Sequence, residues 1–175
     1  MARRLQGLSA INALDKIDEK WEKVPVSELF LELNAIYQRE AEVRSVYFEA
    51  KPPGQDASLW AQPEKLHILF ENLIYNAFRA TPCGGHITVS ASLGDNILYI
   101  TVEDTGCGIA EKELPHIFRR FYVGTNNRET GTGLGLYIVQ SIVTELGGRI
   151  RAISGEGEGT TFVMEFPNYE SNMGL

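Results

Sequence analysis

The hydrophobic positions of the chain follow helical and strand-like periods that alternate along most of its length. Apolar residues at helical spacing predict helices over 3–21, 27–42, 63–80 and 132–146, with a shorter one over 111–121. Short or alternating apolar runs predict strands over 45–50, 58–62, 86–93, 97–104, 149–154 and 160–166. Most of these strands are joined as hairpins, with helices between or before them. The pattern therefore predicts an α+β fold, a two-layer sandwich whose mixed, mainly antiparallel sheet packs against three helices.

The predicted helices differ in how they should begin and in what they should contact. Ser27 is the expected N-cap of the second helix, and Pro63 suits the first turn of the next. Segment 132–146 is apolar nearly all round, so we expect it to be buried. Segment 3–21 carries only a narrow apolar stripe. This stripe is either a seam for another helix or the face of an ordinary amphipathic helix packed on its own domain.

Composition and charge narrow the classes of function. The chain has 175 residues, is 43% hydrophobic and carries a formal net charge of −7. This acidic balance disfavours a general nucleic-acid binder, because duplex affinity comes mainly from cationic side chains. Cys83 and Cys107 lack a metal-binding spacing and are expected to be reduced thiols. No apolar run approaches the length of a membrane span.

Three polar residues recur along one side of the predicted helix 63–80. Asn72, Asn76 and Arg79 stand at i, i+4 and i+7, apart from the apolar arc of the same helix. An amide oxygen can coordinate Mg²⁺, and an arginine can hold a phosphate oxygen. The alternative is a solvated helix face, and the helix taken alone favours that alternative.

Two glycine clusters suggest a nucleotide pocket. Asp104 ends a predicted strand and is followed by Thr-Gly-Cys-Gly-Ile109. A carboxylate there can accept a hydrogen bond from an exocyclic amine such as that of adenine, and glycines let a flat ligand approach the backbone. The second cluster, Gly131–Leu136, opens a helix, where free backbone N–H groups bind phosphate. Neither a P-loop nor a Rossmann fingerprint is present.

The segment between the clusters has the composition of a lid. Phe118 and Phe121 are expected anchors, and Arg119, Arg120 and Arg128 supply cationic donors. Residues 124–130 are polar and include a glycine, which is typical of a loop that orders on its ligand. The alternative is a disordered connection.

Five motifs, in order and at compatible spacing, resemble the N, G1, F, G2 and G3 boxes of sensor histidine kinases. The resemblance is strong over 63–167 and general over 24–62. The motifs are Glu71-Asn-Leu-Ile-Tyr-Asn-Ala-Phe-Arg-Ala-Thr81, Asp104-Thr-Gly-Cys-Gly-Ile109, Ile117-Phe-Arg-Arg-Phe-Tyr122, Gly131-Thr-Gly-Leu-Gly-Leu136 and Gly157-Glu-Gly-Thr-Thr-Phe162.

The resemblance implies the catalytic ATP-binding domain of a two-component kinase, in the GHKL superfamily, with ATP and Mg²⁺ as cofactors. By match, Asn76 would bind Mg²⁺ with Asn72 nearby, and Asp104 would recognise the adenine amine. Arg79 stands where the family usually has lysine, and Ala80 replaces the usual aromatic residue. Asn72, Asn76 and Arg79 form the implied catalytic set. The remaining implied ATP-binding residues are Gly106, Gly108, Ile109, Phe118, Phe121, Tyr122, Gly131, Thr132, Gly133, Leu134, Gly135, Leu136 and Thr160.

Two absences bear on the reaction. Related ATPases and serine kinases carry a general-base glutamate where this chain has Asn72, and Glu71 points about 100° away around the helix. A neutral histidine acceptor already offers a lone pair and needs less help from a base. None of His67, His86 and His116 fits the family's phosphoacceptor motif. We therefore expect transfer to a histidine on a domain missing from this chain. A non-catalytic docking module and a GHKL ATPase are the alternatives.

The resemblance also implies an organisation and partners. Residues 1–22 are expected to be the tail of the dimerisation hairpin, 23–167 the catalytic domain and 168–175 a frayed tail. We expect the sequence to be a cytoplasmic fragment of a longer kinase that can be membrane-bound. Its partners would be the dimerisation and phosphoacceptor domain and a response regulator, with no nucleic acid. The fragment itself is expected to be a monomer or a weak dimer through 3–21.

Overall fold

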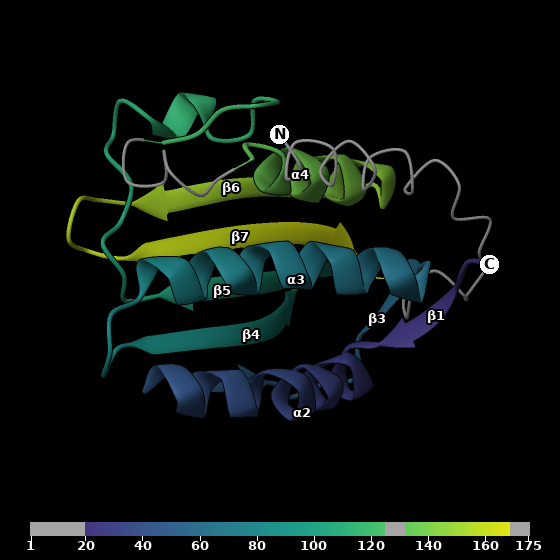
Figure 1. Ribbon diagram of the computed structural model, residues 1–175. Helices are drawn as coiled ribbons and strands as arrows, with labels where there is room; N and C mark the ends of the chain where they lie inside the picture. Colours follow the sequence, from purple (N-terminus) through teal and green to yellow (C-terminus); the bar gives the residue numbers. More distant parts are fainter. Residues whose placement is uncertain (1–19, 125–131, 169–175) are drawn as a thin grey trace.

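The computed structural model describes residues 20–124 and 132–168 of the chain (Figure 1). Within this part the helices are α2 (Val26–Arg44), α3 (Pro63–Ala80) and α4 (Gly135–Glu145), with one 3₁₀ turn, η1 (Leu114–His116). The strands are β1 (Glu22–Pro25), β2 (Tyr47–Lys51), β3 (Ser58–Ala61), β4 (His86–Gly94), β5 (Ile97–Asp104), β6 (Arg149–Ser154) and β7 (Thr160–Pro167).

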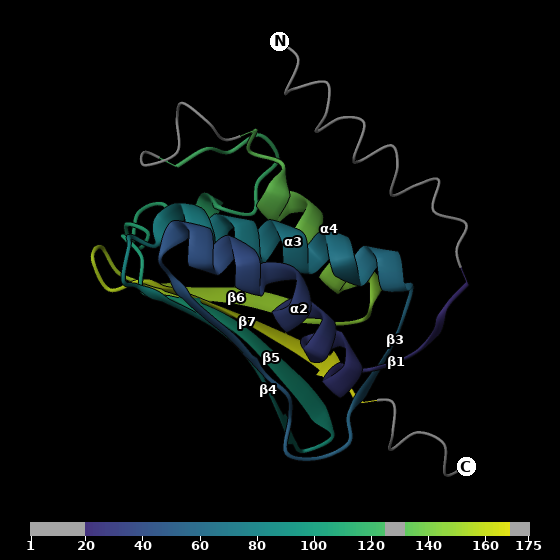
Figure 2. The ribbon, with the colours of Figure 1, turned by 60° about the horizontal axis from the view of Figure 1, so that its bottom comes forward.

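Five strands form the main sheet, in the order β2-β4-β5-β7-β6, and β1 pairs with β3 in a small separate sheet. β2 runs parallel to β4, whereas the other neighbours in the main sheet are antiparallel. All three helices cover the same face of this sheet, with α3 between α2 and α4 (Figures 1 and 2). The predicted α+β sandwich with a mixed, mainly antiparallel sheet is therefore confirmed.

The core lies between the helix layer and the sheet. The apolar arc predicted for α3 is fully buried, and its residues face the alternating inward positions of the central strands. The buried side chains on these elements are Leu66, Leu69, Phe70, Leu73, Ile74, Ala77, Ile87, Val89, Leu98, Ile100, Val102, Met164 and Phe166. Burying this arc fixes the rotation of α3 about its axis, and the polar stripe Asn72, Asn76 and Arg79 is thereby directed away from the core.

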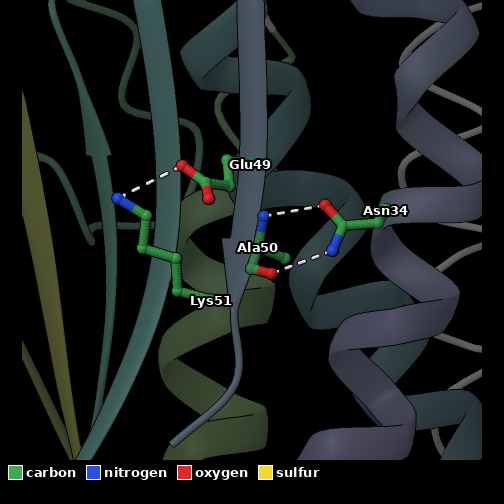
Figure 3. A network of polar contacts seen from close by, with 4 residues as sticks. All are labelled: Asn34, Glu49, Ala50 and Lys51. Carbon is green, nitrogen blue, oxygen red and sulfur yellow. Dashed lines mark hydrogen bonds and ion pairs between the residues drawn. The ribbon is translucent and has the colours of Figure 1, made fainter.

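An amide on α2 ties that helix to the edge of the sheet. Asn34 accepts a hydrogen bond from the backbone N–H of Ala50 and donates one to its carbonyl, both at 2.8 Å (Figure 3). Beside it, Lys51 and Glu49 form an exposed ion pair with 3.1 Å between Nζ and Oε2. Because β2 is an edge strand, the Asn34 amide occupies backbone groups that another strand could otherwise pair with.

The helix boundaries differ from three of the predictions. α2 begins one residue before the expected Ser27 cap, with Pro25 at the N-cap position and no side-chain cap, and it continues to Arg44. Of the helix predicted over 111–121 only η1 forms. Pro115 lacks a backbone N–H, and Phe121 has a left-handed φ of 64°, which a helix does not accommodate. α4 begins at Gly135 rather than 132, because Gly133 has a φ of +69°.

Other predictions are confirmed or lie outside the described residues. α3 begins with Pro63 in its first turn, as expected, and the β4–β5 hairpin turns through Asp95 and Asn96, both with positive φ. The expected helix 3–21 falls almost wholly outside the described residues, as do Gly131 and most of the expected lid. Among the described helices, none is long and apolar enough to cross a bilayer.

Candidate functional site

A cavity of about 310 Å³ opens between α3, the loop after β5 and the start of α4. It gathers most of the residues expected at the site from motifs far apart in the sequence. From α3 come the three polar side chains, and from β7 comes one threonine at the strand start. The predicted residues that line it are Asn72, Asn76, Arg79, Asp104, Gly108, Ile109, Tyr122, Thr132, Gly133, Gly135, Leu136 and Thr160.

The polar stripe of α3 faces this cavity. The Asn72 amide donates to the Ile68 carbonyl at 2.7 Å, which fixes the orientation of its side chain. A Cβ placed on Gly135 would lie 2.7 Å from Asn72 Oδ1, so α4 approaches α3 closely at its first residue. The Asn76 amide has no hydrogen-bond partner among the described residues and is half-buried at the cavity wall. The stripe therefore lines a cavity and is not simply a solvated face.

Asp104 is a buried carboxylate at the end of β5, with only 5% of its surface exposed. Burial raises its pKa from 3.8 to about 6, although hydrogen bonds from the backbone N–H groups of Gly106 and Thr160 partly oppose this rise. The Gly106 N–H lies 2.8 Å from Oδ1. At neutral pH the group is therefore an ionised hydrogen-bond acceptor facing the cavity.

The glycines beside the cavity permit close backbone contacts. Gly108 has a φ of +70°, and a Cβ there would lie 1.8 Å from the Gly155 carbonyl oxygen. At Gly133, with a φ of +69°, a Cβ would lie 2.4 Å from the Phe121 carbonyl carbon. A side chain at either position would force backbone apart, so the residue type is fixed by packing as well as by conformation.

We expect Gly108→Ala to lower the free energy of unfolding more than Gly157→Ala does. Both glycines have positive φ, but a Cβ at Gly157 meets nothing within 4 Å. The matched pair separates the cost of the left-handed conformation, about 1–2 kcal/mol, from the overlap with Gly155, expected to add about 2 kcal/mol. Urea denaturation of both variants measures the difference, and equal losses would contradict it.

Several residues assigned by motif lie beside the cavity and do not line it. The Phe118 ring packs edge-on against Phe162, with 6.3 Å between the ring centroids. Phe121 is 50% exposed, with the Arg120 guanidinium 5.0 Å from its ring centroid. Leu134 is buried, and Gly106 supports Asp104 through its backbone. Any role of these residues in nucleotide binding stays a prediction.

Other residues line the cavity without having been identified from the sequence. Tyr75 stands three residues after Asn72 and four before Arg79, so helical spacing could have identified it. Glu113 is buried and accepts a hydrogen bond from the Tyr122 hydroxyl at 3.3 Å. It lies in an irregular segment, where no periodicity could have indicated it. Cys107, Ile117, Val123, Gly124 and Phe162 complete this group, together with Ala80.

Among residues 20–124 and 132–168, no group of three or more histidine, cysteine, aspartate or glutamate side chains could hold a metal ion. The oxygen-bearing side chains that line the cavity are those of Asn72, Asn76, Asp104 and Glu113, with hydroxyls from Tyr75, Tyr122, Thr132 and Thr160.

Comparison with known proteins identifies the family. Residues 61–170 match the model of the histidine kinase-, DNA gyrase B-, and HSP90-like ATPases. The sensor histidine kinase WalK of Bacillus subtilis is 38% identical over 130 residues, which cover 71% of this chain and 21% of WalK. Sensor histidine kinase Hik2 of Thermosynechococcus vestitus is 34% identical over 146 residues, covering 81% of this chain and 38% of Hik2. The chain thus spans well under half the length of these relatives.

A solved structure agrees with these matches. The nucleotide-free catalytic domain of histidine kinase ThkA superposes with a TM-score of 0.74 at 25% identity, over 85% of this chain and 97% of that domain. The family match covers the cavity from α3 to β7, and the relatives are sensor kinases. The chain therefore belongs to the histidine kinase-, DNA gyrase B-, and HSP90-like ATPase family, as an ATP-binding catalytic domain of the sensor histidine kinase type.

Proposed function

We propose that this domain binds Mg-ATP in the cavity and transfers the γ-phosphate to a histidine on a dimerisation domain outside this chain, in two-component signal transduction. The observation that carries the proposal is the arrangement of one cavity. A buried carboxylate, Asp104, lies at one wall, and the polar stripe Asn72, Asn76 and Arg79 lies at another. The carboxylate is a hydrogen-bond acceptor suited to a nucleotide base. The amide oxygens and the arginine are suited to a metal-bound triphosphate.

In this proposal the adenine lies against the end of β5. Asp104 accepts a hydrogen bond from the exocyclic amine. Gly106 and Gly108 shape this wall, because their missing side chains allow the close packing against Ala80 and Gly155 that holds the loop in place. Ile109 supplies an apolar contact from the cavity wall, and Thr160 flanks the carboxylate from β7. Binding at this wall leaves the phosphates to reach toward α3 and α4.

The phosphates would be held by cationic and backbone donors. Arg79 lines the cavity and offers a planar fork of N–H groups, where a lysine would offer a single ammonium. The first-turn N–H groups of α4, together with those of Thr132 and Gly133, lie where the helix begins and are suited to anions.

The donor set at α3 fits a magnesium ion. The Asn76 amide is half-buried in the cavity wall and has no partner within the described residues, so its oxygen is available as a ligand. Magnesium is usually bound by few protein oxygens together with phosphates and water, which agrees with the absence of a carboxylate cluster in the described residues. Bound Mg²⁺ would neutralise charge that develops on the transferred phosphoryl group.

That the phosphoryl group goes to a histidine is inferred from the absence of a general-base glutamate at position 72 of α3. Asn72 holds the position of a general base, and its amide is already hydrogen-bonded to Ile68. Glu71 is exposed and is not among the described residues that line the cavity. A histidine acceptor offers its own lone pair near neutral pH. Transfer then depends on positioning and charge stabilisation within this site.

We extend the proposal to organisation and partners. Residues 1–22 would continue a dimerisation hairpin, 23–167 would be the catalytic domain, and 168–175 a tail. The partners would be the parent kinase's dimerisation and phosphoacceptor domain and a response regulator receiver domain. This domain would work in the cytoplasm, where ATP is supplied, and would be a monomer or a weak dimer through 3–21.

The test is trans-phosphorylation. The chain is incubated with labelled ATP and Mg²⁺, with and without a separately purified dimerisation domain carrying the acceptor histidine. We expect acid-labile label on the added domain and none on this chain. ATP binding without transfer would favour a docking module. Sustained phosphate release by the chain alone would favour an ATPase, and stable label on the chain itself would contradict the proposal.

A further inference from the structure

Three polar residues occupy paired positions on three neighbouring strands beside the cavity. The sheet register pairs Asp104 on β5 with Thr160 on β7, and Thr160 with Ser154 on β6. Asp104 and Thr160 line the cavity and are each only 5% exposed. Ser154 is not among the described residues that line it, yet its hydroxyl lies 3.0 Å from that of Thr160.

The hydrogen bonds of Ser154 determine the direction of this contact. Its hydroxyl donates to the Gly159 carbonyl at 2.6 Å and accepts from the Ile109 N–H at 2.8 Å. A hydroxyl has one hydrogen and two lone pairs. The hydrogen is engaged by Gly159, whose carbonyl can only accept. The second lone pair of Ser154 must therefore accept the hydrogen of the Thr160 hydroxyl.

This orientation leaves Thr160 without a hydrogen to offer the cavity. Thr160 lines the cavity, and with its hydrogen held by Ser154 its Oγ1 can offer a ligand only lone pairs, as the ionised Asp104 carboxylate does. The two side chains at this wall are therefore both hydrogen-bond acceptors. At the 6-position an exocyclic amine brings N–H donors to such a wall, whereas a carbonyl brings only lone pairs and would stay unpaired. The adjacent ring nitrogen is an acceptor in a 6-aminopurine and carries N–H in a 6-oxopurine, so the argument concerns the contact of Thr160 with the 6-substituent.

We propose that Ser154 is a positioning residue that makes the base site select 6-aminopurine over 6-oxopurine nucleotides, by holding the Thr160 hydroxyl as an acceptor. The inference rests on the proposed placement of the base against Asp104. Without the Ser154 oxygen, the Thr160 hydroxyl is free to rotate and donate to a purine carbonyl. Ser154 would therefore affect which base is bound without touching it.

Equilibrium affinities for ATP and ITP test the proposal, because the two differ only at the 6-position and the adjacent ring nitrogen. We expect the native chain to prefer ATP by about 100-fold or more. In Ser154→Ala this ratio should fall by about tenfold, and Ser154→Thr, which keeps a hydroxyl, should restore it. A general loosening of the fold would lower the affinities for both nucleotides and leave their ratio unchanged. An unchanged ratio in Ser154→Ala would overturn the proposal.

A second variant, Thr160→Val, tests the proposal independently through the direction in which the preference for ATP changes. If Thr160 is an acceptor, Thr160→Val removes a partner of the amine and an obstacle to the carbonyl, so the preference for ATP should fall. If Thr160 instead donates into the cavity, the same change should raise the preference and would overturn the proposal. Failure of the proposed site itself looks different: the native chain would bind ATP no better than the Asp104→Ala variant does.

Discussion

Replacing Asp104 with alanine should weaken ATP binding by about 100-fold, the upper range for a hydrogen bond to a charged group. The carboxylate is buried beside the cavity and already held by two backbone N–H groups, so it accepts from a ligand without reorganising. Titration of the chain with a fluorescent ATP analogue, followed by competition with ATP, measures the loss. Thermal unfolding of the free variant checks that the fold is intact.

Glu103→Gln is the matched control for this prediction. Glu103 precedes Asp104 on β5, but its side chain is exposed and points to the other face of the sheet. Removing its charge should change ATP affinity by no more than about twofold, as is usual for surface substitutions. If both variants lose affinity equally, general electrostatics and not the buried acceptor controls binding.

The pKa of Asp104 gives the same prediction a pH dependence. Burial raises this pKa to about 6, so the acceptor is protonated as the pH falls through that value. Affinity should then fall about tenfold per pH unit. Asp104→Asn should retain only the titration of the phosphates. The free energy of unfolding should have the opposite pH dependence. The pKa of Asp104 is 3.8 in the unfolded chain and about 6 in the folded one, so the protonated carboxyl stabilises the fold fully below pH 3.8. This contribution is lost as the pH rises through about 6.

The sequence predicted the regular elements of this fold better than its irregular ones. The apolar arc of α3 and the alternation of β4 and β5 were sufficient because burial on one face imposes a period. The segment 111–121 has apolar residues at helical spacing, yet it forms only η1, because Pro115 and the left-handed Phe121 interrupt the backbone. Pro115 is a helix-breaking signal that the sequence does display and that the apolar period outweighed in the prediction, whereas the left-handed φ of Phe121 has no local signal.

The same distinction holds within the site. Asn72, Asn76 and Asp104 were identified because they sit on a helix or at a strand end, where position follows from the element. Glu113 reaches the cavity from an irregular loop, and Ser154 acts through Thr160 across the antiparallel pair β6–β7. Contacts of this second kind depend on tertiary register, which a single sequence does not display.

Asn76→Ala should lower the rate of phosphoryl transfer to an added dimerisation domain by about 1,000-fold, since metal stabilisation of transition-state charge contributes several kcal/mol. The amide is half-buried at the cavity wall and has no partner in the described residues, so its oxygen is available to a bound metal ion. Affinity for metal-free ADP should change little, because the base contacts Asp104. The Mg²⁺ concentration needed for half-maximal transfer should rise.

Two further variants decide what that loss means. Asn76→Asp keeps an oxygen ligand and should recover Mg²⁺ dependence, which a purely structural amide would not predict. Glu71→Gln alters the exposed carboxylate next to Asn72, outside the cavity lining, and should leave the transfer rate unchanged. A slow Glu71→Gln would reveal a general base and favour hydrolysis-type chemistry. An Asn76→Ala chain with undiminished rate and Mg²⁺ affinity would mean that the phosphates alone hold the metal, and that α3 contributes charge through Arg79 instead.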